Sequence, residues 1–165
     1  MTAAANKPDL RGIAEGAFIE VLKDLLSLTA SPRTCSSPPL DSEILNPIAS
    51  SVALDGQRVS GTVRIELPQA FVARAVRLLT DRDDPSQDTT AAQTDAAAEI
   101  VNMVAGRVAA RLRLNGYSCR LGTPSVSRGG PEAIQTEPGT DCGRADLVCA
   151  GHRLSIEVHC RYLLA

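Results

Sequence analysis

The sequence predicts an α/β protein of the α+β type, in which two long helices pack on one antiparallel sheet. Apolar residues recur at helical spacing over residues 8–29 and 90–115. Elsewhere, turns lead into segments that alternate apolar and polar residues. The order of helix and strands also repeats, over about 8–82 and again over 90–165. We therefore expect one domain over residues 1–165 with an internal pseudo-two-fold repeat.

Composition narrows the classes of partner. The chain of 165 residues is 44% hydrophobic, and its net charge is −2. Without a broad basic field, nucleic acid and anionic membranes are disfavoured as main partners. No apolar run approaches the roughly 20 residues that span a membrane, and the N-terminus lacks a signal-peptide core, so we expect a cytoplasmic protein.

The cysteines are odd in number and form no Cys-x-x-Cys pair. This pattern indicates neither a disulfide framework nor a zinc knuckle. We expect buried or half-buried free thiols. The five residues are Cys35, Cys119, Cys142, Cys149 and Cys160.

The first half begins with an amphipathic helix over residues 8–29. The proline-rich stretch 30–47 predicts a loop with at most one short edge strand. A hairpin follows over 51–67, with its turn at Asp55-Gly56. A short helix over 69–80 then joins the two halves.

The second half begins with the longest helix, residues 90–115. Thr90 and Gln93 predict a capping box at its start, and Asn115-Gly116 is typical of a helix end.

After this helix we expect a strand and a second hairpin. Residues 117–127 read as the strand, and 128–143 as a loop rich in Gly and Pro. The hairpin runs from 145 to 162. Each hairpin contains one long, regular strand, over 153–162 in this hairpin and over 58–67 in the first. A strand of this kind at the edge of a sheet tends to pair with another copy of the chain. We therefore expect a homodimer.

The exposed face of the long helix carries unusual residues for a solvated surface. Glu99 and Asn102 lie at its crest, one turn apart. Around them we expect a solvent-facing Met103 and the small residues Gly106 and Ala110, which would let another backbone approach closely. The face reads as a docking surface, although spacing alone leaves open that Glu99 and Asn102 are ordinary surface residues.

The spacing of these residues resembles the motif of the CheC/CheX/FliY chemotaxis phosphatases. That motif has an Asp or Ser, then Glu-x-x-Asn, and a proline some twenty positions later. Here Pro124 lies 22 positions after Asn102. The matching residues are Asp95, Glu99, Asn102, Met103, Gly106, Pro124 and Gly129.

The resemblance implies an aspartyl-phosphate phosphatase that hydrolyses the phosphoaspartate of a CheY-type receiver domain. By motif match, Asn102 orients the attacking water and Glu99 pairs with a lysine of the receiver. Asp95 and Pro124 set the shape of the site. The chain needs no cofactor of its own, since the receiver brings Mg²⁺.

The residues on the first long helix distinguish the CheC type of the family from the CheX type. CheC-type relatives carry the Glu-x-x-Asn pair on both long helices, and CheX-type relatives only on the second. Here Glu15 and Glu20 are followed three positions later by Phe18 and Lys23. The sequence therefore resembles the CheX type, with a single site.

Other functions have less support in the sequence. Asp81, Asp83 and Asp84 lack the spacing of a calcium loop. His152 in a turn and His159 on a wet strand face have no partner that suggests catalysis or a metal site. The main alternative is a non-catalytic module of CheX fold that binds phosphorylated receivers as a scaffold or sensor.

Overall fold

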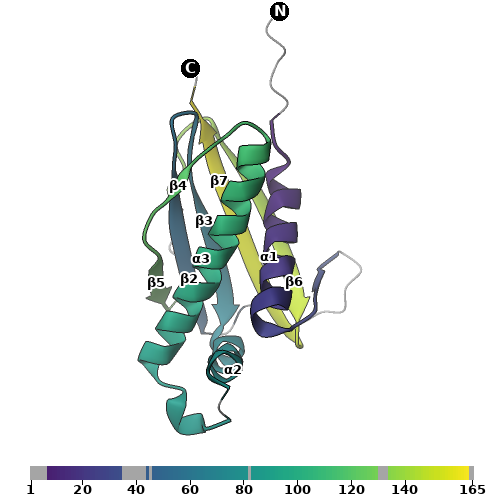
Figure 1. Cartoon of the computed structure of the whole chain (residues 1–165), viewed down its shortest axis with the longest axis vertical. Coiled ribbons are helices and arrows are strands. Elements are labelled where there is room, and N and C mark those ends of the chain that lie inside the picture. Colours follow the sequence, from purple (N-terminus) through teal and green to yellow (C-terminus); the bar gives the residue numbers. More distant parts are fainter. Residues whose placement is uncertain (1–6, 35–43, 45, 82, 130–133, 164–165) are drawn as a thin grey trace, which may run out of the picture.

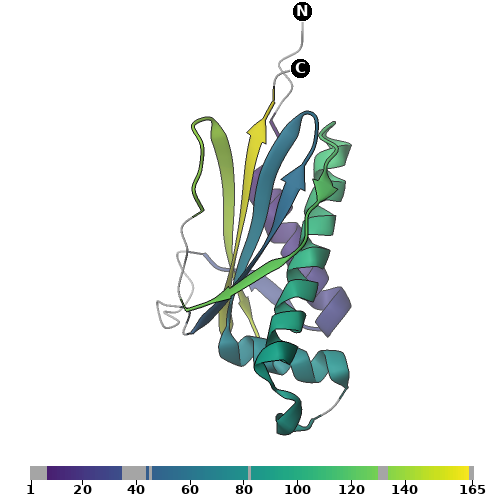
Figure 2. The same ribbon diagram turned by 90° about the vertical axis from the view of Figure 1, so that its left-hand side faces the viewer.

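The computed structural model describes residues 7–34, 44, 46–81, 83–129 and 134–163. Three α-helices pack on one face of a seven-stranded antiparallel sheet (Figures 1 and 2). In chain order the elements are α1 (Leu10–Leu26), β1 (Ala30–Pro32), β2 (Pro47–Asp55), β3 (Val59–Pro68), α2 (Gln69–Thr80), a 3₁₀ turn η1 (Pro85–Gln87), α3 (Thr90–Leu114), β4 (Arg120–Leu121), β5 (Ser125–Arg128), β6 (Thr140–Cys149) and β7 (His152–Tyr162).

The expected fold class is confirmed. α1 and α3 lie side by side along the sheet, and α2 crosses beneath one end of them (Figure 1). Alternate residues of β3 and β7 face these helices, so that Val63, Ile65, Ile156 and Val158 are fully buried. The sheet and helices thus enclose one apolar core.

The sheet order is β1-β6-β7-β3-β2-β4, and β5 also pairs with β2. Each half of the chain lends a strand to the other: β1 pairs with β6, while β4 and β5 pair with β2. The two hairpins meet in the middle, where β3 pairs with β7 from Val59↔Tyr162 to Glu66↔Ser155.

This topology corrects the expectation about sheet edges. The long regular strands β3 and β7 are central and pair with each other, so they offer no free edge. The edges belong to the short strands β1, β4 and β5. The reason given for a homodimer is therefore wrong, and the homodimer itself stays a prediction.

Several element boundaries also differ from expectation. The strand predicted over 117–127 is divided into β4 and β5, and the hairpins begin earlier, at Pro47 and Thr140. Thr89, not Thr90, caps α3: its hydroxyl accepts from the Ala92 amide at 3.1 Å. The predicted helix end is confirmed, since the Tyr117 amide returns to the Leu112 carbonyl beyond Gly116, whose φ is +86°.

The cysteines follow the sequence prediction in part. Cys149 and Cys160 are buried and Cys119 is half-buried, all with free thiols. Cys142 is exposed, because its side chain lies on the outer face of the sheet. Cys35 lies outside the described residues.

None of the described helices has the length and apolar character needed to cross a membrane.

Candidate functional site

The candidate site lies on the exposed face of α3, and the opposite face anchors that helix. Nine of its residues are buried against the sheet, α1 and α2. These are Gln93, Ala96, Ala97, Ile100, Val101, Val104, Ala105, Val108 and Leu112. Because the stripe runs the length of the helix, the orientation of the opposite face is fixed.

Glu99 and Asn102 project from this outer face. Both side chains are exposed, and neither makes a hydrogen bond or ion pair within the described part of the chain. At a separation of three residues they are neighbours on the helix surface. A carboxylate and a carboxamide are thus held one turn apart with their polar atoms available to a partner.

The surface around this pair is open. Apart from the neighbouring backbone of α3, a Cβ added to Gly106 would find no atom of the described residues within 4 Å, and Ala110 one turn later is exposed. Met103 departs from expectation: it is half-buried and packs against the core, because it lies on the flank of α3 that faces α1. The outer face is therefore flatter than the sequence suggested.

Asp95 and Pro124 border the site in different ways. Asp95 is exposed one turn before Glu99 on the same side of α3. Pro124 is half-buried in the edge segment that joins β4 to β5, directly before Ser125, whose partner on β2 is Ser51. This segment runs beside α3 (Figure 2).

Polar contacts tie α3 to its neighbours on both sides. Ser50 of β2 donates to the Ala97 carbonyl at 3.2 Å. Near the start of the helix, Arg128 of β5 donates to the Gln93 side chain at 2.9 Å and to the Thr90 carbonyl at 3.1 Å. The platform beneath Glu99 and Asn102 is therefore held by the sheet and by an edge strand.

On the other flank, ion pairs join α3 to α1. Arg107 reaches Glu20 at 3.3 Å and Asp24 at 2.8 Å, and Arg111 reaches Glu20 at 2.6 Å. These arginines are thus engaged by acids of α1, and no cation of the described residues pairs with the carboxylate of Glu99.

The burial patterns of α1 and α3 coincide when 83 is added to the numbers of α1. Ile13, Ala14, Ala17 and Phe18 then match Ala96, Ala97, Ile100 and Val101, all of them buried. In this alignment Gly16 stands where α3 has Glu99, and Ile19 where it has Asn102. The described structure therefore carries the pair on α3 alone.

The other sequence candidates do not gather into a site. His159 lies on the outer face of the sheet opposite Cys142, but it is only 8% exposed, because residues 134–137 lie beside it. Its Nε2 is 3.1 Å from a Glu157 oxygen. His152 packs edge-on against Phe71. Within the described part of the chain, no group of three or more His, Cys, Asp or Glu side chains is placed to hold a metal ion.

The four described thiols are poor nucleophiles, and the pKa of Cys142, like the others, is raised mainly by burial. Burial raises the pKa of Cys160 to about 12, and it also raises the pKa of Cys119 and Cys149. The crest of α3 instead offers a carboxylate and a carboxamide, which can bind a cation and orient water.

Comparison with known proteins connects this arrangement to a family. The family model "Chemotaxis phosphatase CheX" matches residues 48–147, more than half of the chain. No match is found among the curated proteins.

Solved structures share the fold at low sequence identity. The chemotaxis protein CheX of Vibrio vulnificus superposes with a TM-score of 0.76 at 17% identity, covering 97% of this chain and 100% of that one. CheX from the CheX-CheY-BeF3-Mg²⁺ complex of Borrelia burgdorferi gives 0.67 at 17% identity, covering 94% and 99%. FliY of Thermotoga maritima gives 0.54 at 14% identity, covering 98% and 92%.

The solved structures support the fold, and the family model covers all of α3, including Glu99 and Asn102, together with nearly all of the first β hairpin and most of β6. The chain therefore belongs to the CheX family of chemotaxis phosphatases.

Proposed function

We propose that this protein stimulates hydrolysis of the phosphoaspartate of a CheY-type receiver domain. The observation that carries the proposal is the free Glu99–Asn102 pair, one turn apart on an anchored helix whose surface is open at Gly106. Such a helix can be inserted against a partner as a rigid element.

The chemistry requires little from this chain. An acyl phosphate is already activated: water attacks phosphorus, the bond to the aspartyl oxygen breaks, the aspartate leaves as a carboxylate, and inorganic phosphate takes up the proton of the water. The receiver supplies Mg²⁺, which neutralises charge on the phosphoryl oxygens. What remains to be supplied is a fixed position for the water.

Asn102 is suited to position that water. Its carbonyl oxygen accepts a hydrogen bond from the water, and its NH₂ donates to a phosphoryl oxygen. A neutral amide does both without the charge repulsion that a carboxylate would bring to the phosphoryl group. Because no described side chain holds Asn102, the amide is free to adopt this orientation.

Glu99 is suited to dock a cation of the receiver. Its carboxylate is exposed and makes no ion pair within the described residues, while the nearby arginines of α3 are engaged by Glu20 and Asp24. A lysine beside the phosphoaspartate would pair with Glu99 on association and would place Asn102 one helical turn away at the phosphoryl group.

A relative of the same family supports the choice of partner. The Borrelia burgdorferi structure is a complex of CheX with CheY, BeF3 and Mg²⁺. By analogy we expect a CheY-type receiver as the partner here. Action in the cytoplasm and assembly as a homodimer remain predictions from the sequence.

The test is a decay assay with candidate receivers phosphorylated on their aspartate. The protein is added at one tenth of the receiver concentration, and loss of the phosphoryl group is followed against the receiver alone. Multiple turnovers per protein molecule support the phosphatase. If the protein binds the phosphorylated receiver but leaves its decay rate unchanged, the chain is a scaffold or sensor and the proposal fails.

A further inference from the structure

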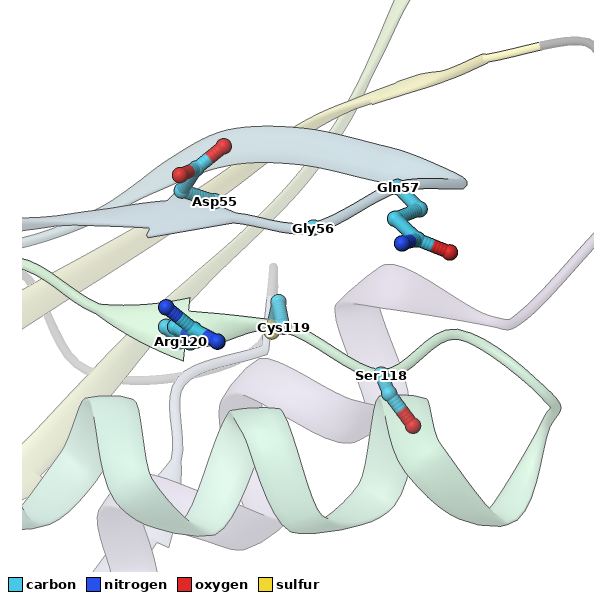
Figure 3. A pocket seen from close by; sticks show the side chains of 6 residues that line it. All are labelled: Asp55, Gly56, Gln57, Ser118, Cys119 and Arg120. Carbon is cyan, nitrogen blue, oxygen red and sulfur yellow. The ribbon is translucent and has the colours of Figure 1, made fainter.

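A hollow surface continues the outer face of α3 towards its C-terminal end. One cavity of about 400 Å³ lies between α3 and the segment that follows it, lined by Ala109, Ala110, Arg113, Ser118 and Cys119. A second, of about 440 Å³, shares Ser118 and Cys119. It extends to Arg120 and to the β2–β3 turn at Asp55, Gly56 and Gln57 (Figure 3). We call the two together the terminal groove.

The terminal groove is aligned with the candidate site. Glu99, Asn102, Gly106, Ala110 and Arg113 fall within an arc of about 80° on the surface of α3. From Asn102 to Arg113 the helix rises about 16 Å. A partner docked at Glu99 and Asn102 can therefore reach the groove without leaving this side of the molecule.

Close contacts fix the segments that line the groove. Gly56 allows the β2–β3 turn to approach the segment after α3, since a Cβ there would lie 2.2 Å from the Ser118 carbonyl oxygen. Arg58 holds the same segment from the turn side: it lies over the Tyr117 ring, 5.3 Å from the centroid, and contacts the Gly116 carbonyl at 3.4 Å. The walls are thus fixed by neighbouring backbone.

The groove carries two positive side chains that are not neutralised by described acids. Arg113 and Arg120 are exposed, and neither makes an ion pair within the described residues. Asp55 lies opposite Arg120 in the strand register, yet the two form no ion pair, and Figure 3 shows the Asp55 carboxylate directed away from Arg120. Two guanidinium groups are therefore available to an incoming acid.

A receiver must contact more than the crest of one helix. A stable protein–protein interface buries on the order of 800 Å² on each partner. The flank of α3 that faces α1 is a poor candidate for the remainder, because Arg107, Arg111, Glu20 and Asp24 already neutralise one another there. The opposite flank holds the groove and its unpaired arginines.

We propose that the terminal groove is a second contact area for the phosphorylated receiver, occupied by an acidic segment that borders its phosphorylation site. Carboxylates are the protein ligands that bind Mg²⁺, so the surface around such a site is acidic and complements Arg113 and Arg120. This inference rests on the proposed function. The groove contributes affinity and orientation, while Glu99 and Asn102 act at the phosphoryl group.

The experiment compares Arg113→Glu/Arg120→Glu with Arg74→Glu, a control that reverses an exposed arginine of α2 without an ion pair in the described residues. Affinity for the phosphorylated receiver is measured at two salt concentrations, and the decay rate of the receiver at saturating protein. We expect the double reversal to weaken affinity at low salt by about tenfold or more, with a smaller loss at high salt and an unchanged rate at saturation. Arg74→Glu keeps the parental affinity.

Three results overturn the inference and leave the proposed function standing. Parental affinity in the double variant shows that the groove lies outside the interface. A fall in the saturated rate with unchanged affinity assigns the arginines to the chemistry instead. Self-association of the parent that the double variant loses, with receiver affinity retained, identifies a second copy of this chain as the occupant. If the parent binds no phosphorylated receiver, the proposed function is contradicted, and the proposed role of the terminal groove with it.

Discussion

The two long helices of this protein occupy equivalent places on the sheet but differ in what they offer to a partner. Both bury the same pattern of positions against the core. α3 carries the exposed pair Glu99 and Asn102, whereas α1 carries Gly16 and Ile19 at the matching positions, both half-buried, with Ile19 packed against the core. The fold therefore sets where a site can be built, and a few exposed residues decide whether one is present.

Gly106 and its counterpart on α1, Lys23, give the sharpest contrast. Gly106→Leu should reduce receiver binding and stimulated hydrolysis to background, because the new side chain starts in space that no other described residue fills and would project towards the partner. Folding should improve slightly, since Gly costs about 1 kcal/mol relative to good helix formers. The measurements are receiver binding, a decay assay and a urea titration.

Lys23→Leu is the matched control, since Lys23 is exposed at the equivalent position of α1. It should leave activity unchanged. If it impaired activity as much as Gly106→Leu, both helices would contact the receiver and the assignment to α3 would be wrong.

Glu99→Ala tests the docking role of the carboxylate. We expect affinity for the phosphorylated receiver to fall about tenfold, the equivalent of about 1.4 kcal/mol, with some loss of rate. Stability should change by less than about 0.5 kcal/mol, because the side chain is exposed. Glu99→Gln keeps the shape and removes the charge, so parental affinity in that variant would contradict an ion pair with the receiver.

Glu20→Ala breaks the ion pairs between α1 and α3. Glu20 contacts both Arg107 and Arg111, but its side chain is 47% exposed, so solvent screens the charges. The free energy of unfolding should fall by only about 0.5–1 kcal/mol, and less at high salt. A urea titration measures this; a loss of several kcal/mol would mean that the network is a main support of the helix pair.

The smallest effect is expected from grafting the pair onto α1. Gly16→Glu/Ile19→Asn, made in an Asn102→Ala background, should restore no measurable activity. Arg111 is placed to capture the new carboxylate, since its guanidinium lies 3.5 Å from where a Cβ at Gly16 would be, and Lys23 stands where α3 has Gly106. Recovery of activity would show that the pair suffices on either helix.

Local patterns predicted most of the fold. The alternation in β3 and β7 and the helical spacing of α1 and α3 are strong because one side of each element is buried. The sequence also placed Glu99 and Asn102 on an exposed face. The catalytic role assigned to them by resemblance stays a prediction.

Features that depend on distant partners could not be predicted. Strand order is one: nothing local shows that β3 pairs with β7, and this pairing removed the supposed free edges. His159 is another, because residues from other segments bury it. Likewise, the different states of Arg107 and Arg113 on one helix arise because acids of α1 reach only the first.

The central claim is that Asn102 orients the attacking water, and one measurement tests it most directly. Decay of the phosphorylated receiver is followed at saturating protein for the parent and for Asn102→Ala, and the affinity of each for the receiver is determined in parallel. We predict that the saturated rate falls by about 10²-fold or more while the affinity changes by less than about threefold. A variant that retains the parental rate at saturation would contradict the mechanism.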